Sequence, residues 1–233
     1  MITGGAKRIG QAISLMLSSL GYRIALHYHH SQDTALQTAA HIRKEKGVCE
    51  LFACDLANEK ETLNLIKDVH QKSPDLNVLI NNASLFAPSG FLSSDLKLFN
   101  AHFAVNLRAP FILCSAFKAI CKKGQIINIL DTNIVKNKTS HIAYLLTKKS
   151  LADMTKLAAV AFAPEIRVNG IAPGLILSPK NETDAYLDRR AREIPLQRKG
   201  DVSYIAWSVK FLLENDYLTG QFIFNDGGEH LVP

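Results

Sequence analysis

Short apolar segments alternate with amphipathic segments along almost the whole chain, and this alternation limits the fold more than any other feature. In the first amphipathic segment, Ile9, Ile13, Leu17 and Leu20 recur at the spacing of one helix face, and Gly21 marks its end. We expect strands at 23–28, 48–53, 76–80, 125–130, 166–171 and 221–224, and helices at 32–46, 59–71, 96–121, 143–162 and 202–213. Strands that alternate with helices pair in parallel, so the pattern predicts a doubly wound α/β fold.

Composition indicates one ordinary globular domain over residues 1–233, because no linker or repeat divides the chain. The net charge is +6, but the basic residues are scattered, which argues against a nucleic-acid partner. No apolar run approaches the roughly 18–20 residues of a membrane span, and the N-terminus lacks a signal-peptide core. The four cysteines show no C-x-x-C spacing, which favours reduced thiols, a cytoplasmic location and no metal.

The opening stretch M-I-T-G-G-A-K-R-I-G combines a glycine turn with the start of a helix. Gly4, Gly5 and Gly10 permit close backbone approach, and the following helix N-terminus offers free N–H groups, which together suit a pyrophosphate. A glycine turn alone is a weak signal, but this one begins a β-α-β unit. Only Met1 and Ile2 precede the turn, so either the first strand is unusually short or the natural chain starts upstream.

The residues after the second expected strand point to the type of dinucleotide. An acidic residue there would bind a ribose 2′-hydroxyl, but the sequence reads His27-Tyr28-His29-His30-Ser31. Lys7, Arg8, His29, His30 and Ser31 can instead supply charge and donors to a 2′-phosphate, so we favour NADPH/NADP. Two alternatives stay open for the histidines: half of a metal site made by His27 and His29, or plain surface positions.

Tyr144 and Lys148 lie four residues apart and therefore on one face of the helix expected at 143–162. A lysine ammonium near a phenol stabilises the phenolate, so we expect Lys148 to lower the pKa of Tyr144 and make it a usable proton donor. This spacing is common by chance and gains weight only from its place after a buried strand.

The motifs together resemble those of the short-chain dehydrogenase/reductase family over essentially the whole chain. The matching stretches are 3–10, Asp55-Leu56, Asn81-Asn82-Ala83, Asn106, Tyr144 with Lys148, Pro173-Gly174 and Asp226-Gly227-Gly228. The resemblance implies a Rossmann-type, mostly parallel, seven-stranded sheet in a single domain. It implies a cofactor site made of Gly4, Lys7, Arg8, Ile9, His29, His30, Ser31, Asp55, Leu56, Asn82, Ala83, Ser84, Lys148, Pro173 and Gly174.

The same resemblance implies how the reaction centre is divided. Tyr144 would deliver the proton, Lys148 would hold the nicotinamide ribose and Asn106 would position a relay water. Asp55 would contact the adenine end, and Asn82 and Ala83 would line the cofactor cleft. The segment after Pro173-Gly174 would lie against the nicotinamide.

Three departures from the common family pattern narrow the resemblance. Asp131 stands where most members have a serine about 13 residues before the tyrosine, and Arg8 replaces the usual middle glycine of the first turn. Ser84 and Phe86 stand where a substrate would lie. With 26–31 and 141–144, this combination is similar to pteridine reductases and to bacterial dihydromonapterin or dihydrofolate reductases.

A pterin explains these exchanges. Phe86 can cover one face of its ring, while Asp131 and Tyr144 share proton delivery to a ring nitrogen. The expected substrate site is Arg8, Ser84, Phe86, Asp131, Tyr144 and Leu175, and the expected catalytic residues are Asp131, Tyr144, Lys148 and Asn106. The alternatives are a loop-capping Asp131 with a core Phe86, a reductase of 3-oxoacyl or other ketones, and a non-catalytic NADP(H) sensor.

Three further expectations concern the surroundings of the site. The closest pteridine reductases have arginine where this chain has His30, which weakens the expected preference for NADPH. The polar stretch 179–193 is expected to be a mobile flap over the substrate. The family resemblance implies a homotetramer or homodimer assembled through the helices at 96–121 and 143–162.

Overall fold

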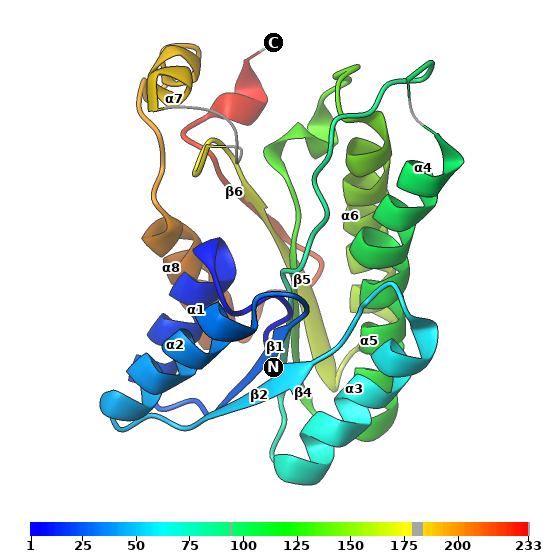
Figure 1. Cartoon of the computed structure of the whole chain (residues 1–233), viewed down its shortest axis with the longest axis vertical. Helices are drawn as coiled ribbons and strands as arrows, with labels where there is room; N and C mark the ends of the chain where they lie inside the picture. Colours follow the sequence, from blue (N-terminus) through cyan, green and yellow to red (C-terminus); the bar gives the residue numbers. More distant parts are fainter. Residues whose placement is uncertain (94, 179–183, 233) are drawn as a thin grey trace.

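A computed structural model describes residues 1–93, 95–178 and 184–232. Its strands are all parallel: β1 (Ile24–Tyr28), β2 (Cys49–Ala53), β3 (Val78–Asn81), β4 (Gly124–Ile129), β5 (Ile166–Pro173) and β6 (Phe222–Asn225). β1 pairs with β2, and β3, β4, β5 and β6 lie side by side in that order. Figure 1 shows these strands in a single twisted layer with helices on both sides.

The two halves of the sheet meet at Ile2. This residue forms parallel bridges to Leu26 on β1 and to Ile80 on β3, so it occupies the central position of the sheet. The described residues thus contain six strands and this bridge, not the seven full strands that were expected. The physical reason is that the chain turns away from the sheet at Thr3, so the described residues join the two halves of the sheet only through the bridges of Ile2.

Helices cover both faces of the sheet, as the alternating pattern predicts (Figure 1). One face carries α1 (Arg8–Ser19), α2 (Gln32–Lys44) and α8 (Val202–Glu214), whose buried side chains pack around Ile13, Ile42 and Val209. The other face carries α3 (Glu59–Lys72), α5 (Ala109–Ile120) and α6 (Ile142–Phe162), which pack around Ile66 and Phe117. Burial of these apolar faces fixes the layers.

A continuous helical stretch at Leu96–Ile120 consists of three parts. They are α4 (Leu96–Phe103), a π-helical turn over Ala104–Arg108 and α5. Within this stretch an 18-residue window with a mean hydropathy of 1.4 is, by length and composition alone, apolar enough to cross a membrane, and the buried core helices of globular proteins pass the same test. Polar residues such as Lys97 and Asn106 interrupt this stretch, so the sequence shows no unbroken apolar run there. In the structure, Asn106 and Phe117 are buried against the rest of the fold.

The remaining elements lie near the carboxyl ends of the strands. They are two 3-10 turns, Thr132–Val135 and Glu229–Leu231, and the helix α7 (Asp184–Ala191). The helix α7 occupies part of the stretch 179–193 that was expected to be a flap; positions 179–183 of that stretch lie outside the described residues. Asn58 caps α3 as its position suggests, because its side chain accepts hydrogen bonds from the backbone N–H groups of Lys60 and Glu61.

Candidate active site

The glycine turn is held against the end of β3 by a small set of hydrogen bonds. The Thr3 hydroxyl accepts the backbone N–H groups of Asn82 (2.9 Å) and Ala83 (3.0 Å). The Asn82 side-chain amide donates to the carbonyls of Thr3 (2.9 Å) and Gly4 (3.2 Å). A Cβ atom on Gly10 would collide with the Gly4 carbonyl, so the tight return of the chain requires glycine there. Through these hydrogen bonds Asn82 and Ala83 hold the glycine turn in place.

His27 is a member of this assembly that the sequence reading missed. It is 2% exposed, and its Nδ1 accepts the Gly4 N–H at 3.0 Å. Its Nε2 must then carry the proton, which it donates to the Cys54 carbonyl at 3.0 Å. Burial lowers the pKa of His27 to about 4, so the ring is neutral at physiological pH. The surface alternative is wrong because the residue is buried, and the metal alternative is wrong because both ring nitrogens already have partners.

The basic residues around the turn lie at its open rim. The Lys7 ammonium donates to the Ser31 hydroxyl at 2.8 Å, and the rings of His29 and His30 lie tilted against each other with centroids 3.5 Å apart. The Nδ1 of His29 lies 3.9 Å from a carboxylate oxygen of Asp55. The structure therefore gathers residues from the glycine turn, the end of β1 and the end of β2, as expected of a dinucleotide site.

Arg8 occupies a position where glycine is usual, and its backbone shows why. Its φ is +56°, in the left-handed region that glycine enters most easily. Its guanidinium donates to the Ser178 carbonyl at 3.2 Å, beyond the end of β5. Arg8 thus reaches from the turn toward the substrate side. Ile9 and Leu56, two other expected cofactor residues, pack against the core.

The expected reaction centre assembles between the end of β4 and helix α6. The Tyr144 hydroxyl donates to Oδ2 of Asp131 at 2.7 Å. The other carboxylate oxygen, Oδ1, accepts the backbone and side-chain N–H groups of Asn133, both at 2.7 Å. The capping alternative for Asp131 is therefore correct for one oxygen, which leaves the second free to bind the tyrosine.

The pKa values at this centre correct one expectation. Burial, the negative charge of Asp131 and the hydrogen bond to Asp131 raise the pKa of Tyr144 well above its usual value. The expected lowering of the Tyr144 pKa by Lys148 was wrong, because burial and the neighbouring Asp131 carboxylate both favour the protonated phenol. The Lys148 ammonium donates to the Ile129 carbonyl at 2.7 Å and lies 5.7 Å above the Tyr144 ring. Burial lowers the pKa of Lys148 to about 8, opposed by Asp131.

Asn106 ties the loop after β3 to helix α6. Its Oδ1 accepts the Leu85 N–H at 2.7 Å, and its Nδ2 donates to the Leu85 carbonyl at 2.9 Å and to the Thr147 hydroxyl at 3.2 Å. The Ser84 hydroxyl also donates to Oδ1, at 3.3 Å. Asn106 sits on the π-helical turn, a widened turn that often occurs at functional sites. Its expected role in holding a relay water stays a prediction.

Phe86 lies beside the Tyr144–Asp131 pair and is not a core residue. Its side chain is 50% exposed, and its ring meets that of Tyr144 edge to face with centroids 4.8 Å apart. The His141 ring stacks on it at 4.3 Å. An exposed aromatic ring at this position offers a flat ligand an apolar surface.

The segment after β5 closes the opposite side of the site. The Gly174 N–H donates to the Asn225 carbonyl at 3.1 Å, and Leu175 is half-buried just beyond it. Asn82, Asp131 and Pro173 thus lie at the carboxyl ends of neighbouring strands, where doubly wound folds bind their ligands. The parallel order of these strands therefore brings the three expected residues to one edge of the sheet.

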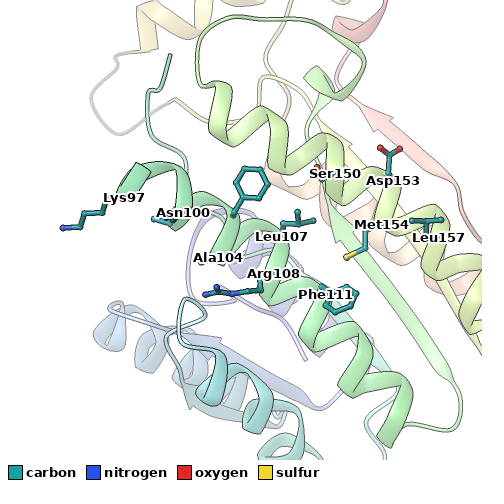
Figure 2. A pocket seen from close by; sticks show the side chains of 12 residues that line it. Lys97, Asn100, Ala104, Leu107, Arg108, Phe111, Ser150, Asp153, Met154 and Leu157 are labelled. Atoms are coloured by element: carbon teal, nitrogen blue, oxygen red, sulfur yellow. The ribbon is translucent and has the colours of Figure 1, made fainter. Parts of the chain in front are cut away.

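A separate hollow in the described part of the chain lies away from these residues (Figure 2). It is an open groove of about 1140 Å³ between the helical stretch Leu96–Ile120 and α6. Leu107 and Phe111 face Met154 and Leu157 across it, while Arg108 and Asp153 lie at its edge. None of the residues expected to bind cofactor or substrate lines this groove, so its size does not identify the reaction centre.

The comparisons with known proteins agree on one family of reductases. A family model described as enoyl-(acyl carrier protein) reductase matches residues 4–230. The 3-oxoacyl-[acyl-carrier-protein] reductase FabG of Staphylococcus epidermidis is 31% identical over 99% of this chain and 98% of its own length. The crystal structure of FolM alternative dihydrofolate reductase 1 from Brucella canis, complexed with NADP, superposes with a TM-score of 0.93. It is 34% identical and covers 100% of this chain and 93% of its own. A Serratia marcescens short-chain dehydrogenase/reductase superposes at 0.92, with 26% identity over 98% of this chain and 96% of its own.

Proposed function

Because this chain belongs to the short-chain dehydrogenase/reductase family, we propose that it is an NADPH-dependent reductase of pteridines. The substrate class is a dihydropterin, such as dihydromonapterin or dihydrofolate, and the product is its tetrahydro form. The similarity to the alternative dihydrofolate reductase from Brucella canis supports this substrate class. The family itself makes the chain an oxidoreductase with a Rossmann-type fold.

The observation that carries the proposal is the hydrogen bond between Tyr144 and Asp131. The two oxygens lie 2.7 Å apart at the end of β4, beside the exposed ring of Phe86. A carboxylate next to the proton donor suits a substrate whose ring nitrogen becomes positively charged as it takes up a proton. The same carboxylate would repel the oxyanion that develops when a ketone is reduced.

The residues at the other end of the cleft fit NADPH. The glycine turn brings backbone N–H groups and the start of α1 to one point, and a side chain at Gly10 would block that approach. Lys7 and Ser31, already in contact, are placed to hold a 2′-phosphate, and His29 and His30 lie beside them. Lys148 would hold the nicotinamide ribose, and the segment after Pro173-Gly174 would lie against the ring. When bound, NADPH supplies the hydride.

This chain's own residues manage the proton. Because the pKa of Tyr144 is raised, the phenol keeps its proton at neutral pH, and Asp131 holds that proton at one defined place. The proton passes from the Tyr144 hydroxyl, shared with Asp131, to the ring nitrogen next to the reduced carbon. The positively charged Lys148, buried nearby, offsets the negative charge that this transfer leaves on the pair.

Reduction of a 3-oxoacyl group is the second candidate. The 31% identity to the Staphylococcus epidermidis enzyme and the description of the matching family model favour it. Tyr144, Lys148 and Asn106 serve either reaction, so they do not separate the two. Asp131 does, because it replaces the neutral hydroxyl that polarises a ketone in most family members.

The deciding experiment follows NADPH oxidation with the purified chain. One set of substrates contains dihydromonapterin, dihydrobiopterin and dihydrofolate; a second contains 3-oxoacyl thioesters and simple ketones. We expect turnover of at least one dihydropterin with kcat/KM of at least about 10⁴ M⁻¹s⁻¹. Turnover of ketones alone overturns the proposal, and cofactor binding without any turnover would favour the sensor alternative.

We further propose that two or four copies associate through the groove of Figure 2, in the cytoplasm. Leu157 (71% exposed), Val160 (83%) and Phe111 (59%) present apolar side chains on adjacent helices, which a second copy of the same face would cover. Sedimentation velocity should show a dimer or tetramer, and Leu157→Glu should yield monomers. A monomeric wild type at micromolar concentration contradicts this assembly.

A further inference from the structure

The motif Asp226-Gly227-Gly228 lies at the end of the last strand, yet its first residue reaches the reaction centre. β5 separates β6 from β4 in the sheet. The chain after β6 crosses over the end of β5 at Gly174, where a Cβ atom would lie 2.5 Å from the Cβ of Asp226. The missing side chain at Gly174 therefore opens the way for Asp226 to approach the turn that follows β4.

Asp226 binds the residue next to Asp131. Its Oδ2 accepts a short hydrogen bond from the hydroxyl of Thr132, which directly follows Asp131 in the chain. Both residues are buried, with Asp226 6% and Thr132 2% exposed. Thr132 begins the 3-10 turn that Asp131 caps, so a fixed Thr132 also fixes the backbone from which the Asp131 carboxylate projects.

The Asp226 carboxylate is saturated by donors that hold it in one orientation. Besides Thr132, the backbone N–H and ring Nδ1 of His230 bind Oδ2, both at 2.8 Å, and the Gly228 N–H binds Oδ1 at 2.9 Å. Burial alone would raise the pKa of Asp226, but these hydrogen bonds outweigh it and keep the pKa below its usual value. The carboxylate is thus a charged, immobile acceptor aimed at Thr132.

We propose that Asp226 is a positioning residue for proton delivery, acting through the Thr132 hydroxyl to hold Asp131 against Tyr144. The inference rests on the proposed role of Asp131 in the reaction. Without the Thr132 hydrogen bond, the turn would lose its anchor to the sheet, and the 2.7 Å contact between Asp131 and Tyr144 would no longer be held. Loosening a supporting contact of this kind lowers kcat more than it weakens substrate binding.

The main variant is Thr132→Val, which keeps the size of the side chain and removes the hydroxyl. We expect kcat to fall about 10–100-fold, as for other residues that orient a functional group without touching the substrate. The KM for the dihydropterin and the Kd for NADPH should change less than about threefold, because Thr132 lies outside both expected binding surfaces. Thr132→Ser restores the hydroxyl and should recover most of kcat. Asp226→Asn should lower kcat in the same way.

Thr155→Val is the matched control for the cost of a buried hydroxyl. Thr155 is 0% exposed, donates to the Leu151 carbonyl at 2.7 Å and accepts from the Asn128 amide at 2.8 Å. Its loss leaves the buried Asn128 amide without this acceptor, so it should lower Tm by a few degrees, at least as much as Thr132→Val. We expect it to keep kcat within about twofold of the wild type.

A double-mutant cycle separates positioning from general loosening. If Thr132 acts through Asp131, Thr132→Val should change kcat less than about twofold in an Asp131→Asn background. Equal losses in both backgrounds, or a wild-type kcat for Thr132→Val, overturn the inference. The proposed function is judged apart from this, by whether the wild type reduces dihydropterins at all. Should only ketones react, the same cycle on a ketone tests the positioning role.

Discussion

The two ends of the candidate active site are built from different kinds of side chain. Around the glycine turn, neutral groups hold the structure: the Thr3 hydroxyl, the Asn82 amide and the uncharged ring of His27. The charges there, such as Lys7, lie at the open rim. At the end of β4 the groups are ionisable: Lys148 is 2% exposed, and Tyr144 and Asp131, which bind each other, are half-buried.

We expect this difference to separate effects on cofactor affinity from effects on kcat. A neutral, pre-formed turn can bind a dinucleotide without changing its own protonation, so alterations there should change cofactor affinity and stability. Buried ionisable groups have shifted pKa values, and such groups are suited to moving protons. Alterations at the end of β4 should therefore change kcat. The four predictions below test this division, beginning with the largest expected effect.

Tyr144→Phe should have the largest effect. The variant removes the transferable proton but keeps the ring, so kcat for dihydropterin reduction should fall about a thousandfold. The Kd for NADPH, measured by fluorescence titration, should stay within about twofold. Tyr204→Phe makes the same chemical change on α8 and serves as the control. A parallel loss of NADPH binding would mean that rate and affinity are not separated at this end of the cleft.

Asp131→Ser restores the hydroxyl that most family members carry. We expect kcat for a dihydropterin to fall about a hundredfold, because one member of the proton-sharing pair is lost. Activity on ketones should stay constant or rise, since the carboxylate no longer opposes an oxyanion. The informative quantity is the ratio of the two activities in parallel assays. An unchanged ratio would remove the main support for pterin specificity.

His27 predicts a pH dependence of stability at the other end of the cleft. In the folded chain its pKa is lowered from 6.5 to about 4, so between these values the unfolded chain binds more protons. The free energy of unfolding should therefore fall as pH falls through this window, by about 2 kcal/mol at pH 5 from this residue alone.

The comparison variant is His27→Gln, whose amide keeps one acceptor and one donor but gains no proton. Urea unfolding at several pH values should show a flatter dependence for the variant than for the wild type between pH 6.5 and 4. Identical slopes for the two proteins would mean that the pKa of His27 does not differ between the folded and the unfolded chain.

Lys7→Ala should have the smallest effect. Loss of one charge-assisted contact to a 2′-phosphate should lower the preference for NADPH over NADH about tenfold, measured as the ratio of kcat/KM values. Because Lys7 lies at the exposed rim, kcat with saturating NADPH should hardly change. Lys44→Ala, on the last turn of α2, controls for general charge. A large fall in kcat would contradict the assignment of Lys7 to affinity.

Features that depend on local spacing could be predicted from the sequence. The helix around Tyr144 and Lys148 follows from its own periodicity, and the glycine turn follows from its place before α1. The order of strands and helices follows from the alternating pattern, apart from the central strand, which is reduced to Ile2. The convergence of Asn82, Asp131 and Pro173 follows in turn, because parallel strands end at the same edge.

Features that depend on contacts between distant segments could not be predicted. His27 looks like part of a polar run, and only the packed fold shows it between Gly4 and Cys54. The spacing of Tyr144 and Lys148 suggests a lowered tyrosine pKa, but burial, together with the charge and hydrogen bond of Asp131 13 residues away, raises it instead. The link from Asp226 to Thr132 joins positions 94 residues apart, across a strand that neither belongs to.

The π-helical turn at Ala104–Arg108 bears on how the chain tolerates insertions and deletions. Its hydrogen bonds span five residues where an α-helix spans four, so the turn holds about one extra residue. Deleting one residue there would let α4 continue into α5 as a regular α-helix with little change in the faces that the two helices present, because the widened turn already absorbs the extra residue. The deletion would instead remove the widened turn that carries Asn106, and with it the contacts of Asn106 to Leu85 and Thr147. The length of this segment is therefore as constrained as its composition.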